Sequence, residues 1–137
     1  MLDLIIKNGQ CYINGELKNL DVSVKDGKIH GIGKISEKTK EIIDAEGLII
    51  LPGCIDTQTH FREPGSTDTE DLNSGSRAAI AGGITAVFEM PNTNPPTSSK
   101  KEFQRKLDLA KNRMYCNYAF YFAVSYTHLR AHETTNY

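Results

Sequence analysis

Cysteine is scarce in this sequence, and its few copies are not spaced in pairs. Cys11, Cys54 and Cys116 are odd in number and lie far apart along the 137 residues. Disulfide frameworks and thiolate zinc sites need cysteines in pairs or at short, regular spacings. The sequence therefore argues against both and predicts free thiols in a reducing compartment.

Long apolar runs are missing as well. No run approaches the ~20 residues that a membrane-spanning helix needs. The start, from Met1 to Lys7, lacks a basic segment and has too short an apolar run for a signal peptide. We therefore predict a cytoplasmic protein that does not enter a membrane.

Neither sign of charge predominates. Sixteen Lys and Arg residues against 17 Asp and Glu residues give a net charge of −1 at pH 7. This balance provides no basic stripe for nucleic acid or for an anionic membrane surface. A small polar substrate or a protein partner is the expectation that remains.

What the chain does have is an ordinary soluble composition, with 39% hydrophobic and 24% charged residues, enough for one modest core. Residues 1–51 contain short strand-like runs separated by Asn-Gly and Asp-Gly pairs, which favour tight hairpin turns. They predict a small antiparallel β unit. The expected strands are Leu4 to Lys7, Gln10 to Ile13, Asp21 to Val24, Lys28 to Ile32 and Glu41 to Asp44.

Residues 52–124 alternate between strand and helix patterns. Ile84 to Met90 is expected as a buried strand, and Cys116 to Val124 as another. Thr67 to Glu70 and Ser99 to Glu102 have the spacing of capping boxes, each of which predicts the start of a helix. This alternation indicates an α/β fold with a parallel sheet.

The most informative stretch runs from Pro52 to Gly65. Read as a strand, its period of two places four polar residues on one face. Each would need a partner if buried, so a functional site explains the pattern better than an ordinary core strand. Parallel α/β folds bind ligands at the carboxyl ends of such strands. The four residues are Asp56, Gln58, His60 and Arg62.

This stretch resembles the signature of the cyclic amidohydrolases, Asp-x-His-x-His-x-Arg-Glu-Pro-Gly, and its ending resembles dihydroorotases in particular. Gly83 to Ala86, together with Glu89 to Thr93, resembles a second motif of that family. The resemblance implies that residues 52–124 are the opening third of a (β/α)8 TIM barrel, since closing one takes ~250 residues. It also implies that residues 1–51 are the first half of a β-sandwich.

The same resemblance implies an activity. Dihydroorotases are zinc hydrolases that cleave a cyclic amide C–N bond, interconverting carbamoyl aspartate and dihydroorotate in pyrimidine biosynthesis. The family takes its remaining metal ligands and its catalytic aspartate from later strands. The chain is therefore expected to be a truncated fragment, inactive alone, with no catalytic residue of its own.

The metal position follows from the matched residues. His60 corresponds to the second metal-binding histidine of the family, whereas Gln58 stands where the first would be. An amide carbonyl is a hard, neutral ligand that suits calcium better than zinc. Asp56 is expected to orient the site rather than bind metal, and its alternative is an aspartate that caps a turn.

Substrate binding is expected at Arg62, Asn92 and His60. The planar guanidinium of Arg62 can bind a carboxylate through two hydrogen bonds, and dihydroorotate carries a carboxylate. By resemblance to the family's Met-Pro-Asn-Thr motif, Asn92 would bind the same group. Its alternative is an ordinary turn residue beside Pro91.

Two other functions stay open. Because Gln58 replaces a ligand, the protein could be a non-catalytic dihydroorotase homologue that assembles with aspartate carbamoyltransferase. It could also be an allantoinase or hydantoinase relative. Arg62 weakens that reading, since allantoinase-like members usually have Asn there and their ureide substrate has no ring carboxylate. A homo-oligomer is compatible with each reading.

Residues 125–137 fit neither pattern and are expected to be an unrelated or disordered tail. His128 and His132 lie four residues apart and could share a helical face that suits a metal. No third ligand accompanies them in a metal-binding motif, so a solvated tail is the expectation.

Overall fold

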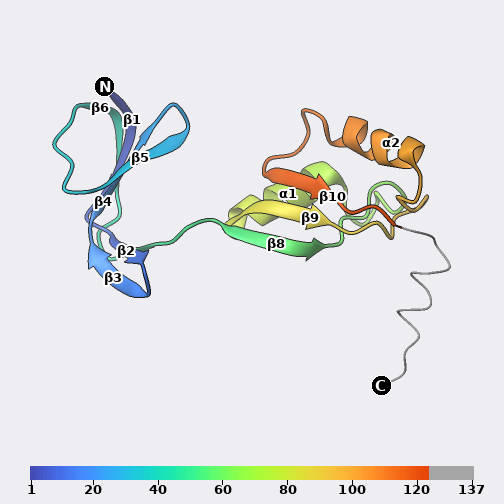
Figure 1. The fold of residues 1–137 in the computed structure, drawn as a ribbon, viewed down its shortest axis with the longest axis horizontal. Coiled ribbons are helices and arrows are strands. Elements are labelled where there is room, and N and C mark those ends of the chain that lie inside the picture. Colours follow the sequence, from blue (N-terminus) through green and yellow to red (C-terminus); the bar gives the residue numbers. More distant parts are fainter. Residues whose placement is uncertain (124–137) are drawn as a thin grey trace, which may run out of the picture. The chain divides into compact units, whose positions relative to one another are not determined.

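The computed structural model describes residues 1–123, which form parts of two compact units (Figure 1). The first unit ends at Pro52 and the second begins at Gly53. The expectations for residues 125–137, including the pair His128 and His132, lie outside the described residues. Within the described part, no helix is long and apolar enough to cross a membrane.

The first unit consists of short strands in two small sheets. The strands are β1 (Leu2–Lys7), β2 (Gln10–Ile13), β3 (Glu16–Asn19), β4 (Asp21–Lys25), β5 (Lys28–Gly33), β6 (Thr39–Asp44) and β7 (Ile49–Ile50). One sheet has the order β5-β4-β1-β6 and the other the order β3-β2-β7. The buried side chains of the unit include Leu2 and Ile5 of β1, Cys11 of β2 and Val22 of β4.

The prediction of an antiparallel unit is right for three strand pairs, among them β1 with β4, and wrong for two. Pairs joined by hairpins, β2 with β3 and β4 with β5, are antiparallel, but β1 pairs with β6 and β2 with β7 in parallel. Turn signals reveal only the pairing of strands that follow one another. A parallel pair is connected by a long excursion of the chain, which leaves no local signal.

The sequence prediction also missed β3. All four of its residues, Glu16 to Asn19, are exposed, so the strand has no alternation of apolar and polar positions. Its pairing with β2 depends on the turn at Asn14 and Gly15, whose φ values of 53° and 86° lie in the left-handed region. Two positive φ values in succession match the tight turn that joins hairpin strands.

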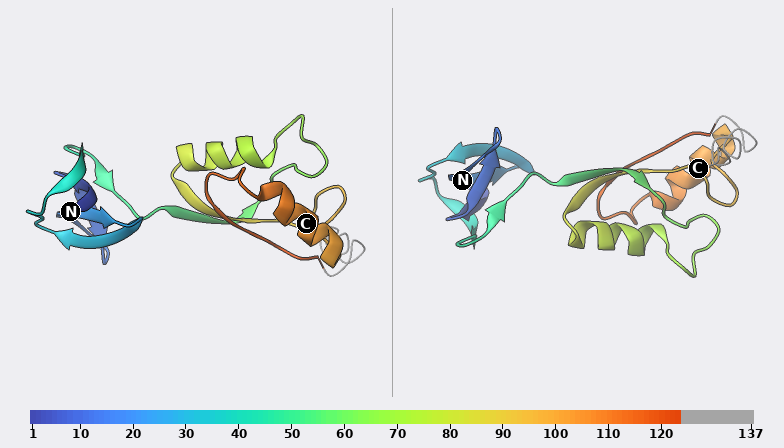
Figure 2. Two further views of the ribbon diagram at one scale, coloured as in Figure 1. Left: turned by 90° about the horizontal axis from the view of Figure 1, so that it is seen from above. Right: turned by 90° about the horizontal axis from the view of Figure 1, so that it is seen from below.

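The second unit is the predicted alternation of strands and helices. Its elements are β8 (Cys54–Thr59), α1 (Leu72–Ala81), β9 (Ile84–Glu89), α2 (Lys100–Ala110) and β10 (Asn117–Phe120). The three strands form a parallel sheet in the order β10-β9-β8, as expected for consecutive strand-helix units. In both views of Figure 2, α1 lies to one side of the strands.

The two helices begin at side-chain caps, one of which the sequence located. Ser99 caps α2, because its side chain accepts a hydrogen bond from the Glu102 N–H at 3.2 Å. The capping box predicted from Thr67 to Glu70 is wrong. Helix α1 is capped by Asp71, which accepts from the Ser74 N–H at 2.6 Å while the Ser74 hydroxyl accepts from the Asp71 N–H. This segment contains several Ser, Thr and Asp residues that could cap a helix, and residue spacing alone did not identify the right one.

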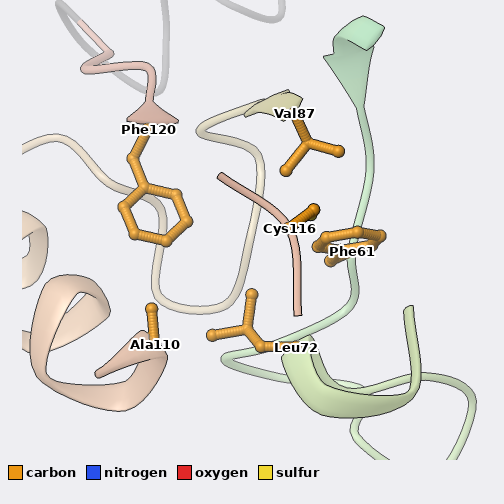
Figure 3. Packing of buried hydrophobic residues seen from close by; sticks show 6 residues of the cluster. All are labelled: Phe61, Leu72, Val87, Ala110, Cys116 and Phe120. Carbon is orange, nitrogen blue, oxygen red and sulfur yellow. The ribbon is translucent and has the colours of Figure 1, made fainter. Parts of the chain in front are cut away.

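One apolar cluster holds the second unit together (Figure 3). Side chains from the sheet, from both helices and from the connecting segments meet there, and together they remove apolar surface from water. The buried members are Phe61, Leu72, Val87, Ala110, Cys116 and Phe120. This packing fixes the carboxyl ends of β8 and β9, from which the loops of the candidate site emerge.

Candidate functional site

The loops that follow β8 and β9 lie against each other. The two strands are parallel, so their carboxyl ends share one edge of the sheet. Where the strands end, the Met90 N–H donates to the Thr59 carbonyl, and between the loops the Asn94 N–H donates to the Pro64 carbonyl, each at 2.9 Å. The two motifs that were singled out in the sequence are therefore brought together.

His60 and Asn92 form the central contact of the two loops. The Nδ1 atom of His60 lies 3.0 Å from Oδ1 of Asn92. An amide oxygen only accepts hydrogen bonds, so with this amide orientation the imidazole proton sits on Nδ1. In the neutral ring, the Nε2 atom then keeps its lone pair. An imidazole held in this way has the form in which histidine binds metals or accepts a proton.

Arg62 and Asn92 also meet at a small hollow between the loops. The hollow has a volume of about 100 Å³, and the side chains of both residues are exposed. A guanidinium and an amide at one hollow can bind a carboxylate or the carbonyl oxygens of a small polar ring. The residues that line the hollow are Phe61, Arg62, Pro64, Gly65, Ser66, Asn92, Thr93 and Asn94.

The predicted single polar face of this strand is wrong. Strand β8 ends at Thr59, so His60 and Arg62 lie in the loop. Within the strand, the pairing with β9 shifts register between Asp56 and Thr59, which interrupts the alternation of sides. Sequence alternation could not reveal this shift, because it depends on how the neighbouring strand pairs.

Asp56 stabilises the irregular segment of β8. Its Oδ1 accepts a hydrogen bond from the backbone N–H of Gln58 at 2.9 Å, the local bond of an aspartate that turns the chain. The geometry matches the turn-capping alternative. Through this bond, Asp56 acts on the backbone just ahead of His60.

The described residues do not complete a metal site. They contain no group of three or more His, Cys, Asp or Glu side chains that could hold a metal ion. His60 can offer Nε2, and Gln58 is exposed on the same strand end. A catalytic zinc needs three protein ligands, so these two residues fit part of such a site and not the whole.

Glu63 anchors the loop that follows β8, a role that the sequence did not reveal. Glu63 as a residue is 7% exposed, and its carboxylate accepts two hydrogen bonds from Arg113, at 2.8 and 3.0 Å. It also accepts the Leu72 N–H at the start of α1, at 3.0 Å. The hydrogen bonds that Arg113 donates to Glu63 raise the pKa of Arg113 above its ordinary value. The partners lie 9 and 50 residues away, so no local pattern could have revealed them.

A buried ion pair between Glu89 and Lys106 supports the second loop. Both side chains have no exposed surface. Burial raises the pKa of Glu89 to about 7, although the Lys106 charge opposes this rise, and burial lowers the pKa of Lys106. The sequence did show one sign of this pair, because Glu89 is a single carboxylate at the end of an otherwise apolar strand. It did not show that the partner is Lys106.

All three cysteines of the chain are free thiols, as the sequence predicted. Cys11 and Cys116 are buried and Cys54 is exposed. Burial raises the pKa of the Cys11 and Cys116 thiols, so neither is disposed to act as a thiolate.

Comparison with known proteins identifies the relatives of this arrangement. An allantoinase from Salmonella choleraesuis (strain SC-B67) is 44% identical over 113 residues, which cover 82% of this chain and 25% of the relative. The chain thus spans about a quarter of the length of the curated relatives that it matches.

Solved structures show the same fold. The L-hydantoinase from Arthrobacter aurescens superimposes with a TM-score of 0.80 and is 31% identical, over 89% of this chain and 28% of its own. The N-acyl-D-glutamate deacylase from Bordetella bronchiseptica, a structure that contains zinc, is 21% identical with a TM-score of 0.61 over 89% of this chain and 29% of its own, and shares the fold alone.

The sequence model of the amidohydrolase family matches residues 49–134, more than half of the chain and the part that contains both loops. These relatives have the TIM-barrel fold, and the second unit has the strand-helix order of its beginning. The chain therefore belongs to the amidohydrolase family.

Proposed function

We propose that the whole protein hydrolyses a cyclic ureide of the allantoin or hydantoin type. The observation that carries this proposal is the 44% identity to an allantoinase over a region that includes both loops of the candidate site. The 31% identity to an L-hydantoinase supports the same substrate class. Dihydroorotase activity, the first expectation from the sequence, becomes the second candidate.

A zinc ion is proposed as the cofactor of the whole protein. His60 would bind it through Nε2, with Gln58 as a weaker contributor and the other ligands supplied by parts of the fold outside the described residues. When bound, zinc supplies a Lewis acid and lowers the pKa of water. The part played by the described residues is to hold the His60 imidazole and to present polar groups at the hollow.

The second candidate, dihydroorotate, is favoured by one specific observation. Arg62 and Asn92 line the same hollow, where they could bind the carboxylate of dihydroorotate together. An uncharged ureide would use Asn92 and leave the guanidinium without an anionic partner. Assembly with aspartate carbamoyltransferase remains a third proposal, which predicts no turnover of either substrate.

Activity assays of the purified whole protein with allantoin, hydantoin and dihydroorotate test these proposals. Hydrolysis of allantoin or hydantoin in preference to dihydroorotate is the expected result. Turnover of dihydroorotate alone would replace the first candidate with the second, and turnover of none would contradict both.

The substitution Arg62→Lys makes the assay sharper. Lysine keeps the charge but loses the planar fork. The KM for a ureide should stay within about twofold, whereas the KM for dihydroorotate should rise about tenfold if a two-point carboxylate contact is lost. Arg77→Lys, an exposed position on α1, is the matched control and should change neither value.

A further inference from the structure

One buried ammonium group joins the two ends of the loop that carries Asn92. The Nζ atom of Lys106, on α2, donates to the Met90 carbonyl at 3.1 Å and to the Thr97 hydroxyl oxygen at 3.4 Å. Met90 and Thr97 flank the segment 91–96. A single side chain from the neighbouring helix thus closes this segment at its base.

Stability alone is a poor explanation for this buried ammonium. Its counter-charge is Glu89, and its Nζ lies 5.2 Å from the centre of the Phe120 ring. Removing an ion pair from water costs about as much as the pair returns, and apolar side chains of similar volume would fill the space equally well. The directed hydrogen bonds from Lys106 to the loop are what an apolar replacement could not provide.

The closed loop places Asn92 against His60. The Thr97 N–H donates to the Pro91 carbonyl at 2.9 Å, which tightens the base of the loop further. From this loop, Oδ1 of Asn92 accepts the hydrogen bond of His60 Nδ1 at 3.0 Å.

We infer that Lys106 is a positioning residue that fixes the Asn92 loop and thereby holds His60 with its proton on Nδ1 and its Nε2 lone pair free. The functional meaning of this arrangement rests on the proposed function, in which Nε2 of His60 would bind the zinc ion. The arrangement itself is a property of the chain and can be measured without substrate.

Nuclear magnetic resonance of the 137-residue chain tests this inference. Long-range proton–nitrogen spectra report which imidazole nitrogen carries the proton, at a pH where imidazoles are neutral. The His60 signal is assigned by its loss in His60→Gln. The double variant Glu89→Gln/Lys106→Met removes the ammonium without leaving a buried carboxylate unpaired.

In the double variant, the ratio of the Nδ1–H to the Nε2–H form of His60 should fall about fivefold, the effect of losing one net hydrogen bond. Lys101→Met removes an exposed lysine from the same helix and should leave the ratio unchanged. A merely structural role of Lys106 would lower stability without changing the ratio in folded protein.

If the double variant does not fold, Thr97→Val is measured in its place. It removes one acceptor of the ammonium while keeping the ion pair and the shape of the side chain. The ratio should then fall in the same direction by a smaller factor. An unchanged ratio in the folded double variant, or in Thr97→Val where the double variant is unfolded, overturns the inference. Absence of ureide hydrolysis by the whole protein would contradict the proposed function but not this result.

Discussion

Gly75 shows how closely the backbone of one residue can approach the core. A Cβ atom built at this position of α1 would lie 2.6 Å from Cδ1 and Cε1 of the buried Phe61 ring. Alanine normally favours a helix over glycine by about 1 kcal/mol. We nevertheless expect Gly75→Ala to destabilise the second unit by about 1–3 kcal/mol, because the ring is confined by its neighbours.

Urea unfolding followed by circular dichroism measures this effect. Gly82→Ala is the control, since a Cβ there has no atom closer than 3.5 Å and the φ of −87° suits alanine. If Gly75→Ala were as stable as the unsubstituted chain, the Phe61 ring would have room to move and the packing argument would fail.

The candidate site residues that the sequence singled out all stand in linear motifs. His60, Arg62 and Asn92 were singled out, and the structure brings them to adjoining loops. The roles of Glu63 and Lys106 were not foreseen, because each acts through a partner on another element. Linear patterns show which residues a site presents, but the groups that hold them in place depend on tertiary contacts.

At the scale of elements, Arg113 connects the segment after α2 to the first loop. Arg113→Met would leave the buried Glu63 carboxylate with the Leu72 N–H as its remaining partner among the bonds described. We expect a loss of about 2 kcal/mol in unfolding free energy. This is less than the ~3–5 kcal/mol of a fully buried pair, because 34% of the Arg113 side chain is exposed.

The same unfolding measurement on three further variants, Arg105→Met, Glu63→Gln and Glu63→Gln/Arg113→Met, tests this assignment. Arg105→Met breaks an ion pair with Glu102 in which the arginine is 53% exposed, and it should cost no more than about 1 kcal/mol. In Glu63→Gln/Arg113→Met the two losses should be less than additive, because both substitutions remove the same contact. Additive losses would show that the two side chains contribute independently.

The elements themselves were predicted well where local signals exist. Periodicity located β9 to within one residue, and the cap at Ser99 located the start of α2. The misplaced cap of α1, the missed β3 and the parallel pairs of the first unit have a common cause. In each of them the local sequence allows more than one structure, and contacts with the rest of the fold decide which one forms.

At the scale of the whole molecule, the chain carries a titratable group whose burial couples stability to pH. Glu89 has its pKa raised from 4.5 to about 7, chiefly because burial disfavours the charged carboxylate. A raised pKa means that the folded state holds the proton more tightly than the unfolded state does. Its contribution to stability is therefore full below pH 4.5 and is lost as the pH rises through about 7.

From this difference we predict that the unfolding free energy of the second unit falls by about 3 kcal/mol between pH 4.5 and pH 7 through Glu89 alone. Glu89→Gln should lose this slope, since an amide does not titrate, and its stability should be nearest to that of the unsubstituted chain at low pH, where the Glu89 carboxyl is neutral as well. Urea unfolding by circular dichroism across this range measures both, and the absence of tryptophan makes this probe preferable to fluorescence. Asp68→Asn, an exposed carboxylate of the same unit, is the control and should keep the slope. A slope that persists in Glu89→Gln would mean that other groups cause it and that Glu89 stays charged in its pair with Lys106.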